Sequence, residues 1–515
     1  MKLVLPEKMK EIDKKTIEEL GVPSLLLMES AAAAVELQVL SFSPRKILLL
    51  CGRGNNGGDA YAAGRKLLAR GLEVSALSLG MPVTKEARLN YRLFKAFGGR
   101  VYKYTELTKK TRSFISEHDL ILDGLFGVGF KGSLSTEMID LIEYVNALSA
   151  IKVAVDIPSG VDGTNGSINP IAFKANVTVT FGAGKPGHFF FPGCVYTGTL
   201  HIARIGFPER LVEDLSNIEL VDDQLAKALL PERIPWGHKG TFGKVCIVGG
   251  SSDYTGAALL AALGSMKIGA GIVYTFTPRE AQEIVRNNLP EAICIASKSV
   301  VLTPEDVDAL IALLDKVDAL VVGPGIGRAD ETIDFVKELL SSKRLKSLGA
   351  VIVDADALYA VSRVPETIKR KGNFILTPHP GEFSRLTKKP IEEVVNNMDT
   401  VKSFAMEMEL QLTLKGAVSI IADKSGGIWL NNTGNTGLAK GGSGDLLSGT
   451  IAGLSAQGLA PLEALVLGSY FMGKAAELTD KYEATLSASA IAANYGKVFE
   501  YLKAYESDSR DKRYN

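Results

Sequence analysis

Asp445 follows directly on a glycine-rich turn, and this pairing could carry out phosphoryl-transfer chemistry. The turn reads Gly441-Gly442-Ser443-Gly444 and leads into a run of small and apolar residues typical of a helix. Such a turn exposes backbone N–H groups and the positive end of the helix dipole, and both attract anions. A carboxylate there could deprotonate a hydroxyl beside N–H groups that stabilise a transferring phosphoryl group. The alternative is that Asp445 only caps the helix.

Other residues of the C-terminal half could bind a ligand. Gly325 lies in Gly-Pro-Gly-Ile-Gly (323–327) and Ala257 at a predicted helix start, so a planar or sugar group could approach the backbone at both. His379 stands between two prolines, a rigid loop position that is unusual for a core histidine. A purely structural turn is the alternative for His379. Lys415 ends a predicted strand and could approach a phosphate, unless it is a solvated surface lysine.

Two further acids, Asp354 and Asp356, lie at the end of the strand predicted within 349–358. Their carboxylate oxygens could contact magnesium or a ribose. A turn at the strand end explains them equally well, so both interpretations stay open.

The N-terminal half contains a second glycine turn, Asn-Asn-Gly-Gly-Asp at 55–59, between a predicted strand and a predicted helix. A GxGxxG dinucleotide pattern begins at Gly52, but the next predicted strand (72–80) ends without the acid that would hold a ribose. This disfavours a hydride-transfer Rossmann domain. Amides and a carboxylate at a helix start suit a phosphate or a sugar. Alternatively, Asp59 only caps the helix and the asparagines tolerate left-handed turns.

Acids also end two other predicted strands of this half. Asp123 ends one of them, and Asp156 ends another, followed closely by Ser159 and Asp162. Ligands of open parallel sheets bind beyond the carboxyl ends of the strands, so these side chains should converge on one site. Asp156 follows an apolar run, and partial burial could tune it for proton transfer. The clustered oxygens could also hold a hard cation.

Strands and helices that could position these residues alternate in both halves. Apolar strand runs separated by amphipathic helices predict mostly parallel sheets covered on both faces, an α/β fold. In the first half the predicted strands lie within 45–52, 72–80, 120–127, 151–160 and 175–184. The predicted helices between them lie within 60–71, 85–99 and 135–148. In the second half the predicted strands lie within 243–251, 270–278, 319–327, 349–358, 373–382, 412–421 and 426–432. The pattern fades near 210–225, so we predict two domains, 1–215 and 216–505.

Composition excludes several classes of protein. Lys plus Arg and Asp plus Glu both total 58 in 515 residues, so net charge gives no case for nucleic acid or an anionic membrane. Four scattered cysteines without CxxC spacing disfavour a zinc site or a disulfide framework. The apolar stretch 24–40 is interrupted by Glu29 and Glu36, and the N-terminus is too charged for a signal peptide. We therefore expect a cytoplasmic protein without a membrane span.

Three stretches of the N-terminal half resemble the NAD(P)H-hydrate epimerase family over about residues 1–210: NNGGD (55–59), LDGLFGVG (122–129) and VAVDIPSGVDG (153–163). The resemblance implies a Rossmann-like three-layer α/β sandwich with a bound potassium ion, whose ligands would be Asn56, Asp123 and Ser159. The implied substrate-facing residues are Asn55, Asn56, Gly57, Gly58, Asp59, Gly127, Val128, Gly129, Phe130, Lys131, Gly132, Ser133 and Asp156. We assign acid/base catalysis to Asp156.

The turn Gly442-Ser443-Gly444-Asp445 resembles the GxGD motif of the ribokinase-like superfamily, in which the aspartate is the catalytic base. Further stretches resemble, in order, the NAD(P)H-hydrate dehydratase family over about residues 225–500: GHKGTFGKVCIVGGS, VVGPGIG, DADAL, LTPHPGEFSRL and TLKGA. The resemblance implies a ribokinase-like α/β domain with Asp445 as catalytic base. The implied substrate-binding residues are Ala257, Gly325 and His379. The implied nucleotide-binding residues are Lys415, Gly416, Ala417, Asn435, Thr436, Gly441, Gly442, Ser443 and Gly444.

Together the two resemblances imply nicotinamide nucleotide repair. The epimerase family interconverts the R and S forms of hydrated NADH and NADPH (NADHX and NADPHX), which needs proton transfer and no redox cofactor. The dehydratase family phosphorylates the S form with a nucleotide and magnesium, and then eliminates phosphate. Bacterial two-domain members use ADP, giving AMP and phosphate, so ADP is expected. The sequence itself selects neither ADP over ATP nor NADHX over NADPHX. Family members commonly assemble, so the resemblance also implies a homo-oligomer.

Two other functions stay open at this point. The C-terminal half could be a ribokinase-like small-molecule kinase for a vitamin alcohol, fused to an epimerase-like binding scaffold. Epimerase-like domains also occur as scaffolds in RNA-decay proteins. The intact acids and amides of the N-terminal half, among them Asn55, Asp59 and Asp123, argue against a degenerate scaffold, as does the neutral charge.

Overall fold

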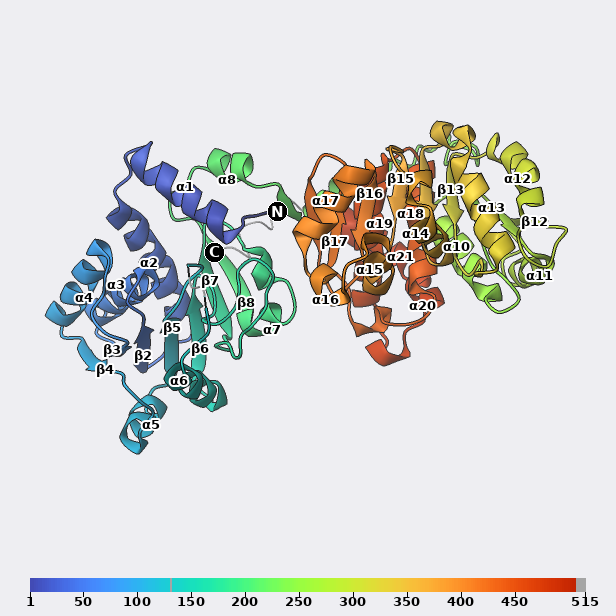
Figure 1. Cartoon of the computed structure of the whole chain (residues 1–515). Helices are drawn as coiled ribbons and strands as arrows, with labels where there is room; N and C mark the ends of the chain where they lie inside the picture. Colours follow the sequence, from blue (N-terminus) through green and yellow to red (C-terminus); the bar gives the residue numbers. More distant parts are fainter. Residues whose placement is uncertain (130–131, 506–515) are drawn as a thin grey trace. The chain divides into compact units, whose positions relative to one another are not determined.

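The computed structural model describes residues 1–129 and 132–505, so Phe130 and Lys131 of the expected substrate loop lie outside the described residues. It divides into two compact units, one of residues 2–217 and one that begins at residue 218. Each unit has its own sheet with helices packed on it (Figure 1). No helix among the described residues combines the length and apolar composition that crossing a bilayer requires.

The described part of the N-terminal unit contains a parallel sheet in the order β4-β3-β2-β5-β6-β7-β8. Its strands are β2 (Lys46–Cys51), β3 (Glu73–Ser78), β4 (Arg100–Lys103), β5 (Leu120–Gly124), β6 (Ile151–Val155), β7 (Val177–Phe181) and β8 (Thr199–Ala203). The helices are α1 (Pro6–Glu18), α2 (Ser24–Leu40), α3 (Asn55–Ala69), α4 (Lys85–Ala96), α5 (Lys109–Ser116), α6 (Thr136–Ala147), α7 (Gly193–Thr197) and α8 (Glu209–Leu215).

Both faces of this sheet are covered. Ile47 and Leu49 of β2 belong to a core shared with α2, α3 and α4, whereas Leu48 and Leu50 belong to a second core shared with α5 and α6. A strand that is apolar at consecutive positions is therefore buried on both sides, as parallel sheets require. The prediction of a three-layer α/β sandwich is confirmed.

The strand order reverses between β2 and β5, which makes their carboxyl ends a topological switch point. Leu50 of β2 lies opposite Asp123 of β5 in the parallel register. On the other side of β5, Asp123 lies opposite Ala154 of β6. The ends of β2, β5 and β6 therefore bring the acids and amides identified in the sequence to one edge of the sheet.

The C-terminal unit has a mostly parallel sheet in the order β9-β18-β17-β16-β15-β14-β13-β10-β11-β12, in which β17 pairs antiparallel with both neighbours. Its strands are β9 (Ile218–Leu220), β10 (Lys244–Val248), β11 (Ile272–Thr277), β12 (Ile293–Ala296), β13 (Ala319–Val322), β14 (Ala350–Val353), β15 (Phe374–Leu376), β16 (Gln411–Leu414), β17 (Ser419–Ala422) and β18 (Ile428–Asn431). The predicted fold class, an α/β domain with a mostly parallel central sheet, is confirmed for this unit too.

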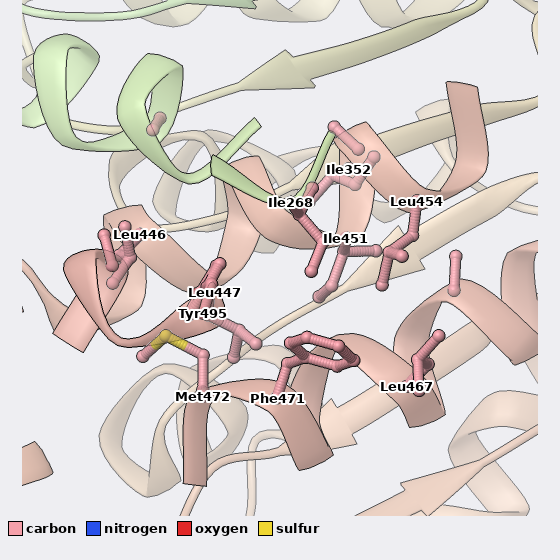
Figure 2. Packing of buried hydrophobic residues seen from close by; sticks show 14 of the residues in the cluster. Ile268, Ile352, Leu446, Leu447, Ile451, Leu454, Leu467, Phe471, Met472 and Tyr495 are labelled. Atoms are coloured by element: carbon pink, nitrogen blue, oxygen red, sulfur yellow. The ribbon is translucent and has the colours of Figure 1, made fainter. Parts of the chain in front are cut away.

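Helices of this unit pack tightly against one another and against the sheet. They are α9 (Asp223–Ala228), α10 (Thr255–Lys267), α11 (Arg279–Asn288), α12 (Val307–Leu314), α13 (Asp330–Ser341), α14 (Asp356–Arg363), α15 (Pro380–Thr387), α16 (Ile391–Val394), α17 (Met398–Met408), α18 (Ser443–Ala456), α19 (Pro461–Glu477), α20 (Ala488–Ala493) and α21 (Tyr495–Ala504). Figure 2 shows Ile451 of α18 among Phe471 and Leu467 of α19 in the buried core. A Cβ at Gly449 would lie 1.8 Å from the carbonyl oxygen of Ala261, so only glycine lets α18 approach α10 this closely.

Candidate active sites

A buried carboxylate at the end of β5 organises the first site. Asp123 has no exposed surface. Its Oδ1 accepts a hydrogen bond from the Ser159 hydroxyl at 2.7 Å, and its Oδ2 accepts one from the Ser159 backbone N–H at 2.8 Å. Oδ1 also accepts from the backbone N–H of Leu125 at 3.1 Å. Burial raises the pKa of Asp123 to about 6, although these hydrogen bonds oppose the increase.

Further oxygens surround this pair. The Ser159 hydroxyl accepts a hydrogen bond from the backbone N–H of Phe126 at 2.9 Å, and Asn56 Nδ2 donates to the carbonyl oxygen of Phe126 at 3.0 Å. Gly127 lies against the same amide, since a Cβ there would be 3.3 Å from Asn56 Oδ1. The three residues expected to bind potassium, Asn56, Asp123 and Ser159, thus lie around one segment, 125–127.

This donor set has the chemistry that a monovalent hard cation requires. It offers one carboxylate together with hydroxyl, amide and carbonyl oxygens, which are hard ligands. Nowhere in the described ranges do three or more His, Cys, Asp or Glu side chains form a cluster that could hold a metal ion. A single negative charge among neutral oxygens matches a singly charged ion, so the residues fit potassium.

Asp156 lies beyond β6 with its backbone in the left-handed region, at φ 66°, which is unfavourable for a residue with a side chain. Its Oδ1 accepts hydrogen bonds from Lys185 Nζ at 2.6 Å and from the Thr180 hydroxyl at 3.0 Å. Burial alone would raise the pKa of Asp156, but Lys185 outweighs burial and holds that pKa below its usual range. The carboxylate is therefore ionised at neutral pH.

Sequence reasoning missed Lys185, Thr180 and His188. Burial and then the nearby Lys185 ammonium lower the pKa of His188 to about 3, although the Asp156 carboxylate opposes the decrease, so this ring is neutral. Thr180 lies inside β7, and the two others follow that strand in a Lys-Pro-Gly-His segment. The usable signal was that β7, like β5 and β6, is a strand whose carboxyl end reaches this edge of the sheet.

The turn 55–59 forms the first residues of α3, whose N-cap is Gly54. Asp59 is the fifth residue of that helix, so the interpretation of Asp59 as a helix cap is wrong. Burial raises the pKa of Asp59 well above its usual range, and the carboxylates of Asp156 and Asp13 raise it further. Asp59 is therefore protonated at a pH where Asp156 is ionised.

The other expected substrate residues of this unit differ in exposure. Asn55 is exposed, whereas Gly57 and Gly58 are buried in α3. Val128 packs against the apolar cluster of Ile157, Val161 and Ala172, which follows β6. Gly132 and Ser133, beyond the two residues outside the described ranges, are exposed.

The second site lies at the N-terminus of α18. Asp445 is the third residue of this helix, and the N-cap is Gly442, so the alternative that Asp445 only caps the helix is wrong. Gly442 has a φ of 90°, a conformation that glycine adopts without strain. Burial and then the carboxylate of Asp354 raise the pKa of Asp445 to about 7, although the Lys415 ammonium opposes the increase. Asp445 can therefore exchange a proton near neutral pH.

A buried ion pair lies beside Asp445. Lys415 Nζ contacts Asp354 Oδ1 at 3.0 Å, and the Ser448 hydroxyl donates to Asp354 Oδ2 at 2.5 Å. Asp354 is only 1% exposed. Burial alone would lower the pKa of Lys415, but Asp354 and then Glu382 outweigh it and raise that pKa. Lys415 is therefore a charged, paired lysine, and the alternative of a solvated surface lysine is wrong.

His379 combines a structural role with an accessible edge. Its Nδ1 accepts the backbone N–H of Gly381 at 3.0 Å at the start of α15, and Glu382 Oε2 accepts the backbone N–H of His379 at 2.8 Å. Because Nδ1 accepts, a neutral ring carries its proton on Nε2. The side chain is 53% exposed. Burial and the charge of Lys415 lower the pKa of His379, which favours this neutral form.

The structure also brings Gly325 and Ala257 together. A Cβ at Gly325 would lie 2.7 Å from Ala257 Cβ, and Gly325 has a φ of 59°. Two residues after Gly325, the Gly327 N–H donates to Asp356 Oδ2 at 3.2 Å, and Arg328 Nε contacts Asp356 Oδ1 at 2.7 Å. Asp356 thus holds the Gly-Pro-Gly-Ile-Gly turn next to the start of α10.

The remaining nucleotide-binding candidates lie in three turns. Gly416 and Ala417 are exposed between β16 and β17. Asn435 Oδ1 accepts the Gly437 N–H at 3.0 Å, and the Thr436 hydroxyl bonds Glu483. The side chains of Asn435 and Thr436 therefore help to hold this turn in place. The third turn is 441–444, in which Ser443 is buried and Gly441 exposed.

Two protein-family models match this chain. A family model described as YjeF-related protein N-terminus matches residues 24–187, and one described as NAD(P)H-hydrate dehydratase matches residues 245–495. The bifunctional NAD(P)H-hydrate repair enzyme Nnr of Moorella thermoacetica is 37% identical over 499 residues, covering 93% of this chain and 92% of the relative. This chain belongs to the family of bifunctional NAD(P)H-hydrate repair enzymes.

Other members of the repair-enzyme family match over a similar length. The enzyme of the same name from Dictyoglomus turgidum is 33% identical over 509 residues, covering 95% of this chain and 96% of the relative. The family resemblance stated from the motifs is confirmed. Because these relatives are named as repair enzymes over nearly their whole length, the kinase alternative is not favoured.

A solved structure also resembles the C-terminal unit of this repair-enzyme family member. It is the ADP/ATP-dependent NAD(P)H-hydrate dehydratase from Bacillus subtilis, co-crystallised with ATP and Mg²⁺. It is 31% identical and covers 56% of this chain and 99% of its own, with a TM-score of 0.47.

Proposed function

We propose that this chain repairs hydrated nicotinamide nucleotides, with epimerisation in the domain 1–215 and dehydration in the domain 216–505. The observation that supports dehydration is Asp445, at the N-terminus of α18, with a pKa of about 7 beside the ammonium of Lys415. A base whose pKa is near neutral suits removal of a proton from a hydroxyl. Membership of the repair-enzyme family names the substrates, NADHX and NADPHX.

Dehydration would begin with Asp445 taking the proton of the 6-hydroxyl of the S form. The hydroxyl oxygen then attacks the terminal phosphoryl group of ADP, the bond to AMP breaks, and the C6–O–P bond forms. The backbone N–H groups of 442–444 and the Lys415 ammonium would stabilise charge on the transferring phosphoryl group. Loss of phosphate from C6 and of a proton from the neighbouring carbon restores NAD(P)H.

Substrate and nucleotide would occupy neighbouring parts of this site. We assign substrate binding to Ala257, Gly325 and the half-exposed side chain of His379, whose Nε2 lies 3.4 Å from Glu382 Oε1. We assign nucleotide binding to the turns that contain Lys415, Gly416, Ala417, Asn435, Thr436, Gly441, Gly442, Ser443 and Gly444. Mg²⁺ would neutralise phosphate charge when bound.

Epimerisation would use Asp156 as acid and base. The ionised carboxylate would remove the proton of the 6-hydroxyl, and the C6–N1 bond would break with its electron pair left on N1 as C6 becomes an aldehyde. N1 would then attack the other face of that aldehyde and close the ring. The same carboxyl group then returns its proton to the new hydroxyl. We assign potassium to Asn56, Asp123 and Ser159, and substrate contacts to 55–59 and 127–133. When bound, potassium would supply positive charge at a fixed place.

The test is recovery of the near-ultraviolet absorbance of NADH from a mixture of R and S NADHX. Either ADP or ATP is added with Mg²⁺ and K⁺, and the purified full chain is used at neutral pH. We expect full recovery of both forms, with ADP preferred. Recovery that stops at the S fraction would reduce the N-terminal domain to a scaffold. Stable phosphorylated product without NADH would instead favour a kinase. We further propose that the protein is cytoplasmic and forms a homo-oligomer. Light scattering of the purified chain measures its oligomeric state.

A further inference from the structure

Lys185 is buried without any exposed surface, in the segment that follows β7. A buried ammonium is costly unless its charge is paired and its donors are used. Lys185 Nζ donates to Asp156 Oδ1 at 2.6 Å, to the Thr180 hydroxyl at 2.7 Å and to the Phe181 carbonyl oxygen at 3.3 Å. These three bonds use the three protons of the ammonium. Lys185 therefore has no donor left for a ligand.

The same segment holds the Asp156 backbone. His188 Nδ1 accepts the Lys185 backbone N–H at 3.1 Å, and His188 Nε2 donates to the Asp156 carbonyl oxygen at 3.1 Å. The Asp156 N–H donates to the Val179 carbonyl oxygen at 2.7 Å. A left-handed aspartate persists only where its surroundings fix it, and these bonds hold the peptide groups on both sides of the Asp156 Cα. Lys185 and His188 thus form a clamp, residues 185–188, on Asp156.

The clamp leaves one carboxylate oxygen available. Both side-chain hydrogen bonds of Asp156 end on Oδ1, and Oδ2 has no partner within the described ranges. The Asp156 side chain is 13% exposed, so solvent or a ligand can reach it. Two other titratable groups lie near this carboxylate: Asp59 on α3, whose own pKa the Asp156 carboxylate raises, and His188 in the clamp, which lowers the pKa of Asp156. Lys185 is the residue that offsets burial there.

We propose that Lys185 is a positioning residue for epimerisation, which fixes Asp156 through Oδ1 so that an ionised Oδ2 faces the substrate hydroxyl. This inference rests on the proposed epimerase function of Asp156. Without Lys185, burial of the Asp156 carboxyl disfavours its ionised form. Loss of Lys185 would then shift the pH dependence of epimerisation. If Lys185 had only a structural role, its loss would leave that pH dependence unchanged.

The experiment measures kcat/KM for R-to-S conversion of NADHX against pH, from about pH 5 to about pH 10, by chromatographic separation of the two forms. Lys185→Met in the full chain should lose on the order of 100-fold near pH 7, because burial then opposes ionisation of the Asp156 carboxyl with no neighbouring ammonium to offset it. Its activity should recover at higher pH. The matched control is Lys152→Met, another buried lysine of this unit, which donates to the Leu148 and Ala150 carbonyl oxygens. This variant should keep the wild-type pH profile.

If the acid limb of the pH–rate profile of Lys185→Met stays at the wild-type pH, the inference is wrong, whatever the rate of the variant. Thr180→Val is the second variant, for use if Lys185→Met does not fold. It removes the hydroxyl between Nζ and Oδ1, and should shift the acid limb the same way with a loss of several-fold; an unshifted limb contradicts the proposal. Asp156→Asn separates the proposed epimerase function of Asp156 from the proposed positioning role of Lys185. If that variant epimerises normally, the proposed function fails, whereas an inactive Asp156→Asn with an unshifted Lys185→Met refutes only the positioning role.

Discussion

Gly444 lies next to the Lys415 ammonium: a Cβ at Gly444 would be 3.2 Å from Lys415 Nζ and 3.8 Å from Asp354 Oδ2. This relationship joins the turn that enters α18 to the end of β16. A side chain at position 444 would push Nζ away from the helix N-terminus. The glycine therefore leaves room for the Lys415 ammonium beside the turn that enters α18.

Gly444→Ala should weaken nucleotide use more than it weakens folding. Displacing the Lys415 ammonium should remove about one charge-assisted hydrogen bond to phosphate, about 1.5–3 kcal/mol, or about 10- to 100-fold in kcat/KM for ADP. Gly496→Ala is the matched control, because that exposed helical glycine has nothing within 4 Å of an added Cβ. Steady-state dehydration rates and thermal unfolding of both variants check this. Wild-type kinetics for Gly444→Ala would show that Lys415 does not act on phosphate.

The pKa of Asp445 predicts the pH dependence of dehydration. Burial raises that pKa to about 7, so kcat/KM should rise with pH through about 7 and level off above it, because the base must be ionised. Asp445→Asn should abolish dehydration and leave epimerisation at its wild-type rate. Separate assays of the two reactions on the same variant check this, and loss of both would contradict a division of labour between the domains.

The same raised pKa links Asp445 to stability. The folded state binds the Asp445 proton more tightly than the unfolded state does, so this group's contribution is present below the unfolded pKa and is lost as pH rises toward about 7. Asp445→Asn should therefore raise the melting temperature at about pH 8 and change it little at about pH 4. Calorimetry at the two pH values checks this. An equal change at both would show that the ionised carboxylate is not destabilising.

Apolar patterning predicts the centre of each sheet from the sequence but not the edges. β2, β5 and β6 are continuous apolar runs because both of their faces are buried. β4 (RVYK) is an edge strand whose residues are mostly exposed, so burial does not select apolar residues there, and it was not predicted. The partly exposed β12 at the edge of the other sheet was missed for the same reason.

The residues of the candidate sites were likewise predicted only in part. Strand-end acids such as Asp123 and Asp156 were predicted because parallel strands end at one edge of a sheet. Lys185 was not, because its pairing with Asp156 depends on how β7 lies beside β6, and a Lys-Pro-Gly-His segment otherwise reads as a surface turn. Ser448, which bonds Asp354, was hidden inside a helical run of small residues.

His379 combines a helix cap with a proposed ligand contact, and two substitutions separate these roles. Asn is a good N-cap residue, so His379→Asn should keep the hydrogen bond to the Gly381 N–H, whereas His379→Ala loses it at a cost of about 1 kcal/mol. Both variants lose Nε2. We expect both to lose about tenfold in kcat/KM for the S form, with only the alanine variant less stable. If only the alanine variant loses activity, in step with its lower stability, His379 is only a helix cap.

Ser159 tests the potassium assignment. Its hydroxyl donates to Asp123 Oδ1 and accepts the Phe126 N–H, and both partners would be left short of a bond in Ser159→Ala, at a cost of about 1–3 kcal/mol. If the same hydroxyl is a potassium ligand, half-maximal activation of epimerisation should need about tenfold more K⁺. Titration of K⁺ into K⁺-free enzyme, with Na⁺ holding ionic strength constant, measures this. Ser116→Ala, an exposed serine of α5, is the control and should leave activation unchanged. A wild-type K⁺ response in Ser159→Ala, together with lowered stability, would make Ser159 a purely structural partner of Asp123.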